Sequence, residues 1–161
     1  MMLADYERKL IHDFFVSILR GISKGAGYNC DVGNVYKSFI DRAKAKINDL
    51  AILAGQEIPE WADSSETEHK TITYFEVVGY VGSDSDPNGE GKLTDAFDSL
   101  SEDVQNALRT SVGTDGWNEL ESKTAIKDLL VKDILPVLDY ESNAGVFSLV
   151  FVVTRYHGQT V

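Results

Sequence analysis

The strongest strand signal in the chain is the stretch His-Lys-Thr-Ile-Thr-Tyr-Phe-Glu-Val-Val-Gly-Tyr-Val, residues 69–81. From Thr71 onward it consists mostly of β-branched and aromatic residues, the types that are enriched in strands. The stretch predicts one long strand. The segments on either side of it decide what kind of sheet it joins.

A helix is predicted on the C-terminal side of this strand. Thr94 or Asp95 can cap it, its apolar side chains recur at helical spacing from Phe97 to Leu108, and Gly113 ends it. This is the central helix of the predicted fold.

The rest of the C-terminal half predicts a short helix and a hairpin. Residues 117–130 have the spacing of a second, shorter helix, and residues 132–141 read as a strand. Pro136 favours an edge position for that strand, because proline cannot donate to a ladder. The turn 142–145 then leads into a closing strand, 146–156, whose two faces are both apolar. We expect this last strand to be central and covered on both sides.

The N-terminal half predicts a long helix followed by extended segments. Residues 3–22 carry an apolar stripe at three- and four-residue intervals, which is typical of an amphipathic helix packed on a sheet. Residues 28–39 are compatible with a short hairpin or an extended segment. Residues 47–58 predict a strand, although the alanines between 43 and 51 leave a helix open as the alternative. Residues 59–69 form an acidic connection.

This order of elements predicts an α+β fold. We expect an antiparallel or mixed β-sheet of about four to five strands packed against the long N-terminal helix and the central helix, with a C-terminal antiparallel hairpin. The two layers, or three, form a single domain that spans residues 1–161.

Composition indicates the cellular compartment in which the protein is expected. The chain is 43% hydrophobic, which is ordinary for a globular protein, and it has no apolar run long enough to span a membrane. Its N-terminal apolar run, Phe14–Leu19, is short and follows acidic residues, so a signal peptide is not expected. The single cysteine, Cys30, excludes an intramolecular disulfide. We expect a protein made in the cytoplasm.

The distribution of charge argues against nucleic-acid recognition. The formal net charge is −11, and residues 51–100 hold two Lys/Arg against eleven Asp/Glu, or −9. Tight binding to nucleic acid needs clustered basic residues that displace counterions from phosphates. The middle third would instead repel a phosphate backbone.

The search for catalytic motifs finds none. The histidines His12, His69 and His157 lie outside any nucleophile motif, and Cys30 is expected to be an inert small side chain. Residues 25–30 begin like a dinucleotide fingerprint but lack its third glycine and follow a helix instead of a strand. We therefore expect neither an enzyme nor a cofactor site.

One acidic loop has some features of a calcium site. Its candidate ligands alternate along the chain: Asp84, Asp86, Asn88 and Asp95. Calcium prefers six to eight oxygen ligands, with a closing carboxylate at position 12 of the loop. Whether the twelve positions are counted from Asp84 or from Asp86, the loop lacks one of the residues that the motif requires. A strand also precedes it, where an EF-hand needs a helix. The competing interpretation is an acidic surface loop that caps a helix.

Three segments together resemble the tail terminator proteins of long-tailed phages, the phage lambda type in particular. They are Leu50–Glu57, Thr71–Val78 and Leu138–Tyr156, and the last combines a polar turn with a final strand that finishes in Thr154 and Tyr156. The chain departs from lambda in its longer loop at 82–92 and in lacking a proline before the first of these strands.

The resemblance implies a structural virion protein of the phage tail or neck, assembled in the host cytoplasm. Such a protein forms a hexameric ring on the last ring of tail-tube subunits, stops tube polymerisation and presents a surface to the head connector. DNA passes through the ring without specific binding. The alternatives are a head-completion or neck protein of a tailed phage and, from another class, a small calcium-dependent binding module.

The same resemblance suggests where the acidic residues and tryptophans act. An acidic lumen would let DNA slide, because like charges repel; plain solubility is the alternative. Trp61 and Trp117, both expected in loops, are candidate anchors for subunit contacts, unless they fold back on their own core. The lumen candidates are Glu57, Glu60, Asp63, Glu66 and Glu68, or the acidic residues within 84–98.

Overall fold

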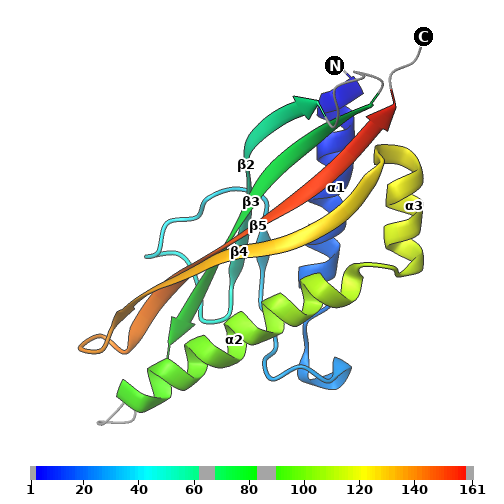
Figure 1. Ribbon diagram of the computed structural model, residues 1–161. Helices are drawn as coiled ribbons and strands as arrows, with labels where there is room; N and C mark the ends of the chain where they lie inside the picture. The colour runs from blue at the N-terminus through cyan, green and yellow to red at the C-terminus, as the bar shows by residue number, and fades with distance from the viewer. Residues whose placement is uncertain (1–2, 62–67, 83–89, 159–161) are drawn as a thin grey trace.

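A mixed β-sheet is the centre of the fold. The computed structural model describes residues 3–61, 68–82 and 90–158. Within these residues the strands are β1 (Val35–Tyr36), β2 (Leu50–Trp61), β3 (Glu68–Gly82), β4 (Ile126–Asp139) and β5 (Ala144–Gly158). They form one sheet in the order β1-β2-β3-β5-β4 (Figure 1). Its pairs are antiparallel except for β1 with β2, so the predicted α+β class is confirmed.

The helices cover one face of this sheet. They are α1 (Leu3–Arg20), the 3-10 turn η1 (Lys24–Ala26), α2 (Glu90–Ser111) and α3 (Asp115–Thr124). Side chains of α1, α2 and α3 meet the inner face of β2, β3 and β5 in one core, which makes the fold two-layered (Figure 1). At its centre Phe15 of α1 packs edge-on against Phe151, which stacks on Phe75 at 5.3 Å. None of the described helices is long and apolar enough to cross a membrane.

The boundary between α3 and β4 corrects one prediction. The helix expected over 117–130 ends at Thr124, Ala125 turns the chain with a positive φ of 59°, and β4 begins at Ile126. The leucines and valine that follow have helix-compatible spacing, but they pair in register with β5. Tertiary pairing therefore overrides local spacing here.

The N-terminal half contains more strand than expected. Residues 50–61 form β2, so the strand interpretation of this region is confirmed and the helical alternative is wrong. Because β2 runs to residue 61 and β3 begins at residue 68, the two ends of the expected 59–69 connection belong to strands. The segment 28–39 contributes only the short β1, which pairs in parallel with β2.

The outer face of the sheet is left open on its β4 side and is covered over β2, over part of β3 and at Val146 of β5. There Ile40 and Ala45, from the connection between β1 and β2, pack with Val78 and Tyr80. The Tyr80 hydroxyl donates to the Ile40 carbonyl at 2.7 Å. The closing strand β5 is central, as expected, because it lies between β3 and β4. On its outer face Val146 packs against the covered cluster and Val152 is buried, so the expected cover on both sides is confirmed for these residues, whereas the neighbouring strand β4 is left open.

Candidate functional site

Of the three histidines, His12 makes a structural contact in the described part of the chain. His12 on α1 places Nε2 2.8 Å from the Ile52 carbonyl, where the nitrogen must donate because a carbonyl can only accept. The side chains of His69 and His157 lie outside the described part of the structure, although their backbones pair across β3 and β5. His12 therefore ties α1 to β2 through this hydrogen bond.

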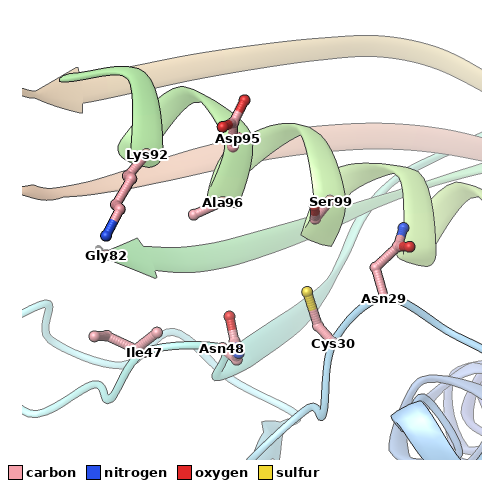
Figure 2. Close-up of a pocket in the computed structure, with 9 residues that line it drawn as sticks. All are labelled: Asn29, Cys30, Ile47, Asn48, Gly82, Lys92, Asp95, Ala96 and Ser99. Atoms are coloured by element: carbon pink, nitrogen blue, oxygen red, sulfur yellow. The ribbon is translucent and has the colours of Figure 1, made fainter. Parts of the chain in front are cut away.

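Cys30 lines a hollow of about 390 Å³ between α2 and the loops that precede β2 (Figure 2). Burial, and then the nearby Asp103 carboxylate, raise the pKa of the Cys30 thiol to about 11. The thiol is therefore protonated at neutral pH and is a poor nucleophile. Asp103 itself is buried and accepts hydrogen bonds from the backbone N–H groups of Asn29 and Cys30, so it fixes this loop.

The calcium-loop candidates are divided between the loop and α2. Asp84, Asp86 and Asn88 lie outside the described residues, and Asp95 is an exposed residue of α2 at the rim of the same hollow. Within 3–61, 68–82 and 90–158 no group of three or more His, Cys, Asp or Glu side chains is placed to hold a metal ion. Asp95 has no described ligand set around it.

Trp117 is not available to a partner. It lies in α3, not in a loop, and it is only 2% exposed. Its indole packs edge-on against Phe14 of α1 at 6.3 Å, so the expected exposure is wrong and the alternative, folding back on its own core, holds. The backbone of Trp61 ends β2, and its side chain is outside the described part.

The lumen candidate Glu57 is already paired. It contacts the Arg155 guanidinium and accepts a hydrogen bond from the Thr73 hydroxyl at 3.2 Å. Arg155 is 2% exposed and also donates to Glu7 of α1 at 3.0 Å. Burial lowers the pKa of the Arg155 guanidinium, and the Glu7 carboxylate opposes this shift. Glu57 thus joins β2 to β5 and is not a free surface charge.

The other lumen candidates cannot be placed in this way. Glu60 and Glu68 belong to the adjacent ends of β2 and β3, and their side chains are outside the described part of the structure. Asp63 and Glu66 lie outside the described residues altogether.

The most distinctive surface is the outer face of β3, β5 and β4. The register aligns its side chains in rows, for example Tyr74 beside Val152 and Val152 beside Leu130. Three β4 side chains are largely exposed there: Leu130 at 55%, Leu135 at 64% and Val137 at 60%. We call this surface the open apolar patch. It comprises the exposed Leu130, Leu135 and Val137 together with the half-buried Ile72, Tyr74 and Val150.

A hollow and a few charges mark one end of the open apolar patch. The hollow has a volume of about 420 Å³, and Tyr74, Leu130 and Val152 line it together with Asp128 and Lys132. Asp133 and Ser148 lie in the same rows and divide the patch, because they pair with Val150 and Leu135. Exposed apolar patches on monomeric proteins mark interaction sites. The open apolar patch is therefore the candidate functional site.

Sequence reasoning missed this patch although its signal was present. The closing strand was recognised as apolar on both faces, which requires cover for both. With the helices on one face, cover for the second face comes from the β1–β2 connection, which packs over β2, β3 and Val146 of β5 and leaves the β4 side open. A scan of protein-family models and a search of curated proteins find no match to the chain.

Proposed function

We propose that this protein is a non-enzymatic structural subunit that assembles into a ring, the tail terminator of a tailed phage. The observation that supports the proposal most is the open apolar patch. Its residues Leu130, Leu135 and Val137 are more than half exposed although they are large and apolar. Exposing this apolar surface to water is unfavourable. A neighbouring subunit or the tail tube would cover it and remove that cost.

A ring requires two different surfaces on each subunit, because each subunit meets one neighbour on each side. The open apolar patch supplies one of them. A second group of exposed apolar side chains lies on the β1–β2 connection, where Phe39 is 70% and Ile47 is 53% exposed. In the proposed hexamer these two surfaces meet, and the ring ends the tail tube and contacts the head connector.

The acidic composition suits the passage of DNA. Residues 51–100 carry a formal charge of −9. A ring whose lumen carries part of this charge would repel the phosphate backbone and let DNA pass without binding. Glu57 contributes less to such a field than a free carboxylate would, because Arg155 pairs with it and with Glu7.

Electron microscopy of the concentrated protein tests the ring. Leu135→Asp places a charge in the open apolar patch. Val112→Asp is the matched control, because Val112 directly follows α2 and is an apolar residue that is 42% exposed. We expect rings for the wild type and for Val112→Asp, and none for Leu135→Asp.

Rings that persist in Leu135→Asp would contradict the role of the open apolar patch. The absence of rings from all three proteins would contradict the proposed function. A wild type that forms rings but does not stop the growth of tail tubes would instead favour a head-completion or neck protein.

A further inference from the structure

The hollow in the open apolar patch can receive an apolar side chain. It has a volume of about 420 Å³, and Tyr74, Val152 and Leu130 lie side by side across it as one row of the sheet. Leu130 is 55% exposed in the single chain. Pockets that take up a buried aromatic side chain of a partner are the usual centres of protein contacts.

The rows on either side of this apolar row carry carboxylates. Two residues away along β5 in one direction, the row contains Asp128, and two residues away in the other direction it contains Glu76 and Asp133. Each of these steps is about 7 Å along the strand. Lys132 also lines the hollow, so three carboxylates stand against one ammonium group in these three rows. The hollow is therefore an apolar recess in an acidic surrounding.

The connection between β1 and β2 has the complementary character. Its residues 42–46 contain Arg42, Lys44 and Lys46, the highest density of basic residues in the sequence, and all three are exposed. Close by in the sequence, Phe39 is 70% exposed, more than any other large apolar side chain in the described part of the chain. An exposed phenyl ring thus accompanies a basic stretch.

Phe39 cannot reach the hollow of its own chain. The next residue, Ile40, packs on the outer face near Tyr80, whose hydroxyl donates to the Ile40 carbonyl. Tyr80 and Tyr74 are six residues apart on β3, which corresponds to about 20 Å. The Phe39 side chain is too short to cover this distance, so a ring in the hollow must come from another molecule.

Charge complementarity indicates that this other molecule is a second copy of the chain. Each chain has a formal net charge of −11, so two copies repel each other unless their contact brings opposite charges together. Contact between the basic connection of one copy and the acidic hollow of the next does so. Complementary charges at an interface also fix its register.

We propose that Phe39 of one copy inserts into the hollow of a second copy, beside Tyr74 and Leu130, while the basic residues 42–46 meet the carboxylates around the hollow. The inference rests on the proposed self-assembly and names its contact. Each copy presents one phenyl ring and one hollow, so the contact can continue head to tail from copy to copy until a ring closes.

Exchange of the charges tests the contact. One variant carries Arg42→Glu, Lys44→Glu and Lys46→Glu, and the other carries Asp128→Lys and Asp133→Lys. For each variant alone, we expect the dissociation constant of self-association, measured by sedimentation, to rise at least about tenfold, because like charges then meet. An equimolar mixture should associate again, since the acidic connection of the first variant fits the basic hollow of the second.

The mixture has a built-in control. The reversals change the formal charge from −11 to −17 in the first variant and from −11 to −7 in the second, so attraction between net charges cannot cause the recovery. A mixture that associates no better than the separate variants would overturn the proposal. So would a first variant that self-associates like the wild type, even if it loses affinity for duplex DNA.

Truncation of the phenyl ring tests the apolar part of the contact. Phe39→Ala should raise the dissociation constant about tenfold or more, as expected for an aromatic anchor. Val112→Ala, which shortens another exposed apolar side chain, is the matched control and should leave it unchanged. Thermal denaturation should show the same stability for both variants. Equal dissociation constants for the two variants would overturn the role of Phe39.

Cross-linking separates this proposal from the ring. In a Cys30→Ser background, Phe39→Cys/Leu130→Cys is treated with a short bismaleimide, and Phe39→Cys/Val112→Cys is the control. We expect a ladder of products up to six chains for the first protein only. Products that stop at two chains would support the contact and contradict the ring. Rings in the microscope, with no more cross-linked product than in the control, would contradict the contact alone.

Discussion

Arg155 of β5 and Glu7 of α1 form an ion pair beneath the N-terminal helix, with Nη1 donating to Oε2 at 3.0 Å. The guanidinium is 2% exposed and also meets Glu57 of β2. One cation thus ties α1, β2 and β5 together.

Removal of this cation should be costly. Arg155→Met leaves the Glu7 and Glu57 carboxylates facing each other without their partner, and we expect the free energy of unfolding to fall by about 3 kcal/mol. Urea denaturation measures it. Lys123→Met, which removes an exposed ion pair with Glu119, is the control and should change stability by less than about 0.5 kcal/mol. Similar effects of the two substitutions would contradict the structural role of Arg155.

Glycine is required at position 79, because an aromatic ring fills the space that a Cβ atom would need. A Cβ atom at this position of β3 would lie 2.2 Å from Cε1 of Phe147, which is 1% exposed and part of the core. Gly79→Ala should therefore destabilise the protein by about 2 kcal/mol through overpacking. The double variant Gly79→Ala/Phe147→Leu should lose less stability than the two single effects added together. Strict additivity would show that the two residues are not in conflict.

Trp117 should behave as a core residue. Because its indole is buried between α3 and α1, Trp117→Ala is expected to lower the free energy of unfolding by about 3 kcal/mol. Thermal denaturation followed by circular dichroism checks this. A variant of wild-type stability that fails only to assemble would identify Trp117 as an interface residue instead.

Cys30 should react slowly with alkylating agents. Since the thiolate is the nucleophile and the pKa of Cys30 is raised to about 11, the rate with iodoacetamide should still increase with pH up to 9.5, without a plateau near 9. Asp103→Asn removes the largest electrostatic contribution to the raised pKa and should speed the reaction at pH 8. Asp31→Asn, which removes an exposed and weaker one, is the control. A reaction rate that levels off near pH 9 in the wild type would contradict the raised pKa of the Cys30 thiol.

The sequence was sufficient to predict the helices and strands that have a strong apolar periodicity. The stripe of α1 and the β-branched run of β3 each correspond to one type of element, and both were predicted. Residues 126–130 were not, because a short apolar run fits a helix and a buried strand equally well. Only pairing with β5 decides between them.

The candidate site was harder to predict, because it depends on which elements cover which face. The apolar outer face of β5 was visible in the sequence, but the sequence did not show that all three α-helices pack on the other side. The burial of Trp117 and the ion pair of Glu57 could not be read from the sequence for a similar reason. A side chain's exposure depends on its tertiary neighbours, Phe14 and Arg155, which lie far away along the chain.

Absolute mass in solution, measured by light scattering over a range of protein concentrations, tests the central claim most directly. The ring predicts a species of six times the 17.8 kDa chain mass that grows with concentration. A mass that never exceeds two chains at any concentration would contradict it.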